Sequence, residues 1–331
     1  MTQNNIVPSQ NGVDSVDAFA PIDARPQLAV SSWLGASYHF INRDLLPPFN
    51  WPAFETLLEK YQADRITTGR ADIDVMPVAA CMAAGGHVEQ ALPVAASWTM
   101  YILAGRIFDD LADGEGEGRQ WFTGHSTLTA MSGCLFAVST ANAALAHLDG
   151  ATMYRDIATA FSHTLALAVK SENNQPPLSQ LSVEMYFETI AAKTGLVFAT
   201  GAWAGGRTVT DDEVVLNALY KYGLHLGMMT QILDDCLDLK TDLANQVWTL
   251  PLIYAVTQET HPAYKRLRKL LSQQRPTQNW VDEVAAVLAE MNAVSWSLQI
   301  AEAYRQQTVD IIKTLPYHQD LLTHYVTPQN K

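Results

Sequence analysis

The chain has 331 residues, of which 48% are apolar and 17% charged, and its formal net charge is −13. This apolar content is enough for a large buried core and too high for a disordered chain. The acidic balance argues against nucleic acid as a partner, because binding to phosphates needs a basic surface. The three cysteines, Cys81, Cys134 and Cys236, form no CxxC pair. This excludes a disulfide scaffold or a cysteine zinc site and favours a reducing, cytoplasmic environment.

The order of elements along the chain predicts an all-α protein. Residues 1–27 are polar and rich in turn formers, so we expect a flexible N-terminal extension there, and no secretory signal is predicted. From about residue 50, helix formers are frequent and β-branched alternation is rare. We therefore expect residues 28–331 to form a single helical domain. Helices are predicted at roughly 52–64, 75–85, 89–113, 125–148, 152–171, 179–203, 211–240, 248–257, 262–273, 279–292 and 296–315.

The most apolar run, residues 91–108, has about the length of a membrane span. It contains polar residues, among them Arg106, and it continues directly into Asp109 and Asp110. These features favour a buried core helix, so we expect no stable membrane insertion.

Two acidic clusters with the pattern Asp-Asp-x-x-Asp each end a long apolar helix. In each cluster the first and last aspartates lie one helical turn apart, so they share a face and repel each other. A fold tolerates this repulsion where a cation fills the gap, and Mg²⁺ takes one or two carboxylates together with substrate phosphates. The pattern therefore predicts several Mg²⁺ ions around one diphosphate. The six aspartates are Asp109, Asp110, Asp113, Asp234, Asp235 and Asp238.

Over roughly residues 60–325 the sequence resembles the trans-isoprenyl diphosphate synthase family, also called the polyprenyl synthetase family. Besides the two clusters, the resemblance rests on Gln231 ahead of the second cluster, on the Lys193-Thr194 pair and on the Thr-Leu-Pro-Leu-Ile-Tyr-Ala string at 249–255. It implies an isoprenoid synthase helical bundle with a deep central cavity, and a homodimer.

The resemblance also implies a reaction. Both clusters would bind an allylic prenyl diphosphate through three Mg²⁺ ions, and ionisation would give a carbocation and pyrophosphate before prenyl transfer to an acceptor. The residues agree with this chemistry, because metal ions and fixed cations stabilise the charge that develops on pyrophosphate. An apolar cavity protects the cation from water.

Five further side chains are expected at the diphosphate. The resemblance places Lys193 and Arg119 on pyrophosphate, and Lys240, two residues after the second cluster, is expected to join them. Gln231 lies one turn before the second cluster and is expected to support its metal shell. Arg70 is the one base that remains where elongating relatives carry a basic stretch.

Basic residues that elongating relatives carry are missing here, so the identity of the prenyl acceptor is undecided. The stretch 69–77 contains two aspartates, and the Arg-Arg pair of elongating relatives is reduced to Gly118-Arg119. A second, metal-free diphosphate would be poorly compensated there. Two functions fit: prenyl transfer to an acceptor other than isopentenyl diphosphate, or a class I terpene synthase acting on a C15 or C20 diphosphate.

The helix that leads to the first cluster also indicates a limit on chain length. Gly105 and Ala104 leave its last turn open, whereas Tyr101 and Trp98 come one and two turns deeper. By analogy with the family, we expect these two aromatic residues to form the cavity floor.

Overall fold

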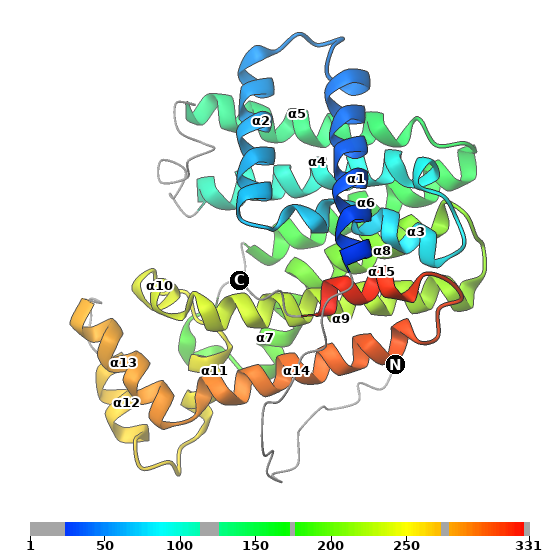
Figure 1. The fold of residues 1–331 in the computed structure, drawn as a ribbon. Helices are drawn as coiled ribbons and strands as arrows, with labels where there is room; N and C mark the ends of the chain where they lie inside the picture. The colour runs from blue at the N-terminus through cyan, green and yellow to red at the C-terminus, as the bar shows by residue number, and fades with distance from the viewer. Residues whose placement is uncertain (1–23, 113–125, 173–175, 273–277, 328–331) are drawn as a thin grey trace.

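A computed structural model describes residues 24–112, 126–172, 176–272 and 278–327, and within these ranges the chain is helical and contains no strand (Figure 1). The predicted all-α fold is confirmed. The first part contains α1 (Ala24–Phe40), the π-helical turn η1 (Ile41–Leu45), α2 (Pro52–Thr67), the 3₁₀ turn η2 (Ala71–Val75), α3 (Met76–Ala83), α4 (Val88–Ala112), α5 (Thr127–Leu145) and α6 (Ala151–Glu172). The second part contains η4 (Leu178–Gln180), α7 (Val183–Ile190), the π-helical turn η5 (Ala191–Gly195), α8 (Leu196–Arg207), α9 (Glu213–Leu237), α10 (Leu239–Ala244), α11 (Leu250–Thr257), α12 (Tyr264–Leu271), α13 (Gln278–Glu290), α14 (Ala293–Ile312), α15 (Gln319–Thr323) and η6 (His324–Val326).

Several elements differ from the predicted ones. Helix α1 was not predicted, and it begins at Ala24, inside the stretch expected to be a flexible extension. The helix predicted over 179–203 is interrupted by η5, and the helix predicted over 211–240 ends at Leu237 before the short α10. Residues 1–23 lie outside the described part of the chain.

Helix α4 runs through the middle of the bundle and packs against α3, α5 and α8. By length and composition alone, α4 and α5 would each be able to span a membrane. The apolar window of α4 is 72% buried inside the protein, as expected for a core helix, whereas that of α5 is only 39% buried. Helix α5 therefore presents apolar side chains on its outer side.

Two glycines let helices approach α8 closely. A Cβ atom on Gly205 would lie 2.0 Å from the carbonyl oxygen of Pro77, so α8 touches α3 backbone to backbone. A Cβ atom on Gly223 would lie 2.3 Å from the carbonyl oxygen of Phe198, which brings α9 equally close to α8. These contacts fix α9, the helix that ends in the second aspartate cluster.

A second hydrophobic cluster lies under α10–α13, the yellow and orange lobe at the lower left of Figure 1. Its buried side chains include Leu243, Leu267 and Trp280, and the Trp280 indole donates to the carbonyl oxygen of Leu270 at 2.8 Å. This lobe packs beside the end of α9 through α10 and α11.

A buried ion pair joins the N-terminal helices. Asp74 on η2 is 0% exposed and accepts a hydrogen bond from Arg65 at 2.5 Å and one from the Tyr38 hydroxyl at 2.7 Å. Its neighbour Asp72 pairs with His324 of η6 at 2.7 Å. Both acids of the 69–77 stretch are therefore held by side chains of the protein itself.

Candidate active site

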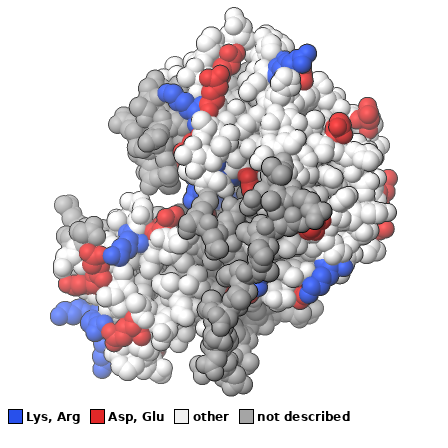
Figure 2. Space-filling model, viewed as in Figure 1, with Lys and Arg blue, Asp and Glu red and all other residues white. Residues whose placement is uncertain are grey.

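The second aspartate cluster lies where α9 ends, next to the lobe of α10–α13. Asp234 is half-buried and Asp235 is 6% exposed, while Asp238 is exposed and caps the helix. The first and last of these share a face, as their spacing predicts, and Asp235 is turned away from them by its position on the helix. Figure 2 shows a hollow at this end of the molecule, with acidic and basic atoms at its edge.

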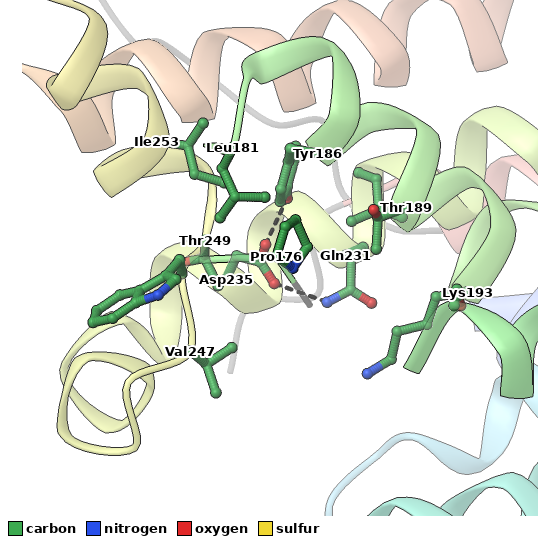
Figure 3. A pocket seen from close by; sticks show the side chains of 13 residues that line it. Pro176, Leu181, Tyr186, Thr189, Lys193, Gln231, Asp235, Val247, Thr249 and Ile253 are labelled. Carbon is green, nitrogen blue, oxygen red and sulfur yellow. Dashed lines mark hydrogen bonds between the residues drawn. The ribbon is translucent and has the colours of Figure 1, made fainter. Parts of the chain in front are cut away.

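A cavity of about 110 Å³ opens beside Asp235. Polar side chains from α7, η5 and α9 line it, and apolar side chains come from the segments before α7 and α11 and from these two helices (Figure 3). Three residues predicted to act on a diphosphate, Lys193, Gln231 and Asp235, line it together. The remaining lining residues are Ser171, Pro176, Leu181, Tyr186, Thr189, Ile190, Val247, Trp248, Thr249 and Ile253.

A chain of hydrogen bonds orders the polar side of this cavity. The Tyr186 hydroxyl donates to Oδ2 of Asp235 at 2.5 Å, and the Gln231 amide donates to Oδ1 of the same carboxylate at 2.8 Å. The Thr194 hydroxyl donates to Oε1 of Gln231 at 2.6 Å. Both oxygens of Asp235 thus accept hydrogen bonds inside the protein, as Figure 3 shows. Whether Asp235 also binds metal stays a prediction.

Burial makes two carboxylates of this cluster, those of Asp234 and Asp235, costly to ionise. It raises the pKa of Asp234, an effect to which Asp238 adds and which Arg70 and Arg106 oppose. It also raises the pKa of Asp235, against the hydrogen bonds from Tyr186 and Gln231. Desolvation disfavours the charged form in both cases. A cation bound at the cluster would offset this cost.

Helix α4 brings the end that carries the first cluster into the same region. Asp109 is half-buried and Asp110 is 3% exposed, whereas Asp113 and Arg119 fall outside the described residues. Arg106 lies one turn before Asp109, and its charge acts on Asp234 of α9. The ends of α4 and α9 are therefore electrostatically coupled across the hollow. Sequence reasoning missed Arg106 as a site residue, although its spacing from the cluster was a signal.

The structure separates the predicted basic residues. Lys193 extends to the open side of the cavity, and the exposed Arg70 lies close enough to Asp234 to act on its pKa. Lys240 instead donates to Asp282 of α13 at 2.7 Å and does not line the cavity. Its expected contact with a diphosphate stays a prediction without support from this geometry.

Thr249 is a second residue that sequence reasoning did not single out for the site. Its side chain is 7% exposed and lines the cavity, and its hydroxyl has no hydrogen-bond partner within the described part of the chain. A buried hydroxyl without a partner carries a desolvation penalty, which a ligand with acceptor oxygens would remove. The residue stands first in the Thr-Leu-Pro string, which was the available signal.

The two aromatic residues expected at the cavity floor are both buried and lie near each other. The Trp98 indole donates to the carbonyl oxygen of Ile73 at 3.1 Å, and its ring packs where Gly201 lacks a side chain. Tyr101 donates to Asn142 at 3.3 Å. The Phe161 ring contacts both, with centroids 6.4 Å from Trp98 and 5.5 Å from Tyr101. Their role as a floor stays a prediction.

Comparison with known proteins identifies the family. The sequence profile described as polyprenyl synthetase matches residues 73–291, which is more than half of the chain. The chain belongs to the polyprenyl synthetase family. It is 30% identical over 146 residues to heptaprenyl diphosphate synthase component 2 of Bacillus subtilis, a match that covers 41% of each chain. It is 23% identical over 256 residues to the geranylgeranyl diphosphate synthase of Saccharolobus solfataricus, covering 70% of this chain and 76% of the relative.

Solved structures of the family share the fold. A polyprenyl synthase from Caulobacter crescentus, complexed with calcium and isoprenyl diphosphate, aligns with a TM-score of 0.77 and 19% identity, covering 91% of this chain and 95% of that one. The chain therefore has the all-α isoprenoid synthase fold. The matches to the Bacillus subtilis relative and to an octaprenyl diphosphate synthase of Haemophilus influenzae span less than half the length of those proteins.

The described residues suit Mg²⁺ only together with a ligand. Within the described ranges, no group of three or more His, Cys, Asp and Glu side chains gathers to hold a metal ion. Asp234 and Asp238 nevertheless offer hard oxygen donors on one helix face, and burial of Asp234 favours a neighbouring cation. This donor set fits ions that take one or two carboxylates and complete their shell with phosphate oxygens.

Proposed function

We propose that this polyprenyl synthetase ionises an allylic prenyl diphosphate, releases pyrophosphate and transfers the prenyl group to an acceptor. The observation that carries the proposal is the convergence of Lys193, Gln231 and Asp235 on one cavity at the second aspartate cluster. Residues from two elements, η5 and α9, meet there, although up to 42 positions separate them in the sequence.

Each side chain has a role set by its chemistry. The Lys193 ammonium is a point charge for a pyrophosphate oxygen, and Arg70 and Arg106 place two further cations near Asp234. Gln231 holds the Asp235 carboxylate in place. Arg119 and Lys240 remain proposed pyrophosphate ligands, the first lying outside the described residues.

Magnesium ions, three by resemblance to the family, would be held by Asp109, Asp110 and Asp113 on one side and by Asp234, Asp235 and Asp238 on the other. When bound, they supply positive charge that stabilises the departing pyrophosphate. The protein's own part is to present these oxygens on two helix ends and to keep the prenyl chain in apolar surroundings below them, where Trp98 and Tyr101 would limit its length.

A second candidate function, a class I terpene synthase acting on a C15 or C20 diphosphate, is favoured by the stretch 69–77. Asp72 and Asp74 are paired with His324 and Arg65, so this stretch presents Arg70 as its one base. A second diphosphate without metal would need several cations to replace its hydration. An acceptor without a diphosphate, or attack by the substrate's own double bonds, fits this surface better.

Product analysis decides between these functions. The full chain is incubated with Mg²⁺ and geranyl, farnesyl or geranylgeranyl diphosphate, each with and without isopentenyl diphosphate, and pyrophosphate and organic products are measured. A hydrocarbon or terpene alcohol formed from one substrate supports the synthase, and a longer diphosphate supports elongation. Absence of pyrophosphate release from every substrate refutes the terpene synthase and transfer to isopentenyl diphosphate, and release that persists in EDTA refutes the metal requirement.

The outer side of α5 supports a homodimer. Leu128, Met131 and Leu135 are 72%, 56% and 72% exposed, and the helix carries no Lys, Arg, Asp or Glu. Two copies of a chain with a net charge of −13 meet most easily through an uncharged face. Sedimentation should give a dimer for the unaltered chain and a monomer for Leu135→Glu; a monomer in both cases refutes this interface.

A cytoplasmic location is proposed from the cysteines. Cys81, Cys134 and Cys236 all carry free thiols, which suits a reducing compartment. Fractionation of cells that produce the full chain tests this, and recovery in an oxidising compartment refutes it.

A further inference from the structure

The π-helical turn η5 presents Lys193 to the cavity. It interrupts what would otherwise be one helix from α7 to α8, and such turns are rare and often lie at functional sites. On its inner side η5 packs tightly against α9, since a Cβ atom on Gly227 would lie 2.9 Å from the carbonyl oxygen of Thr194. The side chain of Thr194 is the part of the turn that reaches the hydrogen-bond chain described above.

We infer that Tyr186 is a positioning residue for Lys193, acting through Asp235, Gln231 and Thr194. The three bonds of 2.5, 2.8 and 2.6 Å connect α7, α9 and η5 without a gap. Tyr186 is 4% exposed and lines the same cavity as Lys193, and its hydroxyl is bonded to Asp235. This inference rests on the proposed function only in taking Lys193 as a pyrophosphate ligand.

The direction of each hydrogen bond explains how the effect is passed on. An ionised carboxylate only accepts, so Asp235 needs donors on both oxygens when it is buried. With Tyr186 in place, Gln231 turns its NH₂ group toward Asp235 and leaves its carbonyl oxygen for the Thr194 hydroxyl. Without the Tyr186 hydroxyl, the carboxylate is free to rotate toward another donor. Gln231 and then Thr194 lose their fixed orientation, and η5 can shift with Lys193.

Tyr186→Phe tests the inference, because it removes one hydroxyl and leaves the ring in place. The matched control is Tyr222→Phe, since Tyr222 is also buried and its hydroxyl donates to the carbonyl oxygen of Leu322 at 3.2 Å, far from the cavity. Affinity for inorganic pyrophosphate in the presence of Mg²⁺ is measured by calorimetry on the full chain, and thermal unfolding checks that each variant folds.

We expect Tyr186→Phe to weaken pyrophosphate binding about tenfold, as for a lost hydrogen bond to a charged group. The control should stay within about twofold. The deciding measurement is a double-mutant cycle with Lys193→Met, in which the effect of Tyr186→Phe should shrink to below about twofold. Thr194→Val breaks the far end of the chain, and its effect should likewise vanish when Lys193 is replaced.

Three results would overturn the inference. If Tyr186→Phe binds pyrophosphate as tightly as the unaltered chain, the hydrogen-bond chain does not position Lys193. If its loss persists undiminished with Lys193→Met, Tyr186 acts on another group. In both cases the proposed function stands. Failure of the unaltered chain to bind pyrophosphate overturns the proposed function and this inference together.

Discussion

The buried pair of Asp74 and Arg65 gives a direct test of the fold that supports the site. Asp74→Asn removes the negative charge but keeps the shape of the side chain. The Asp74 side chain is 0% exposed and that of Arg65 is 11% exposed, so the guanidinium would be left in the protein interior without its carboxylate. Breaking such a pair typically costs about 3–5 kcal/mol in the free energy of unfolding.

Two further variants separate the contribution of the Tyr38 hydrogen bond from that of the unpaired charge. Tyr38→Phe removes only the bond of 2.7 Å and should cost about 1.5–3 kcal/mol, because the acceptor is charged. Replacing both charges, as in Arg65→Met with Asp74→Leu, should be less destabilising than Asp74→Asn alone, since no uncompensated charge remains.

Urea unfolding of the full chain at neutral pH measures these differences. A matched control is Glu290→Gln, which breaks the exposed pair of Glu290 with Arg266, where the two side chains are 47% and 54% exposed. We expect it to change stability by less than about 1 kcal/mol. The reasoning is refuted if Asp74→Asn costs no more than this control, or if the double replacement is as unstable as Asp74→Asn.

Five other substitutions probe the site and the packing of the bundle. Burial raises the folded-state pKa of Asp234 above its ordinary 3.8. The folded protein therefore holds the proton more tightly than the unfolded chain does. The contribution of this group to stability falls as pH rises from 3.8 through the folded-state pKa. Asp234→Asn should therefore raise the melting temperature of the metal-free protein at neutral pH but not in acid, while it abolishes turnover; an unchanged melting temperature at neutral pH contradicts this. Thr249→Val should weaken pyrophosphate binding about five- to tenfold in calorimetry, because the site loses a donor, and unchanged affinity excludes that contact. Gly205→Ala should cost at least about 1–3 kcal/mol in urea unfolding, since its Cβ would lie 2.0 Å from a backbone oxygen of α3. Gly105→Ala is the control, because nothing lies within 4 Å of its Cβ, and it should be neutral or up to about 1 kcal/mol stabilising. An equal loss of stability in the two glycine variants would contradict the close contact between α8 and α3. Trp98→Ala should let longer prenyl chains be accepted or released in product analysis, and an unchanged chain length means that Trp98 is no floor.

Local spacing was enough to predict most of the helices and part of the site. The i, i+4 aspartates did place Asp234 and Asp238 on one face, and the apolar periodicity identified α4 as a core helix. Helix α1 was missed because its sequence follows a proline-rich, polar start and lacks a strong apolar pattern. Its place in the fold comes from contacts with α4 and η2, which a single sequence does not reveal.

The position of Lys240 shows how one helix end changes a side chain's partner. The prediction extended a helix to residue 240, which would continue the face of the second cluster. Helix α9 instead ends at Leu237 with Asp238 as its cap, and Lys240 belongs to α10. The turn between the helices points its ammonium to Asp282, 42 residues further along the chain. Helix ends are the least predictable part of a helix, and here the end decides the contact.

The contacts missed in the site join residues that are distant in sequence. Tyr186 and Asp235 are 49 positions apart, and Thr194 and Gln231 are 37 apart. The spacing of seven from Tyr186 to Lys193 would place both on one side of a regular helix, but η5 changes that register. Likewise, Asp72 and Asp74 were recognised only as lost bases, because their partners His324 and Arg65 lie in other elements.

The electrostatics of the two acidic helix ends explain why an acidic protein can hold an anionic ligand there. Burial works against the charge on Asp234 and Asp235; among the described residues, the cations Arg70, Arg106 and Lys193 oppose this effect, together with the hydrogen bonds from Tyr186 and Gln231 to Asp235. These three described cations do not neutralise both clusters and a diphosphate, so without further positive charge either the acids or the ligand would remain uncompensated. Divalent ions bound between carboxylates and phosphates would compensate the negative charge of the aspartates and that of the diphosphate at the same time. The affinity for pyrophosphate should therefore depend more steeply on Mg²⁺ than on any single basic residue, and it should fall in Asp234→Asn even though that variant is the more stable apoprotein.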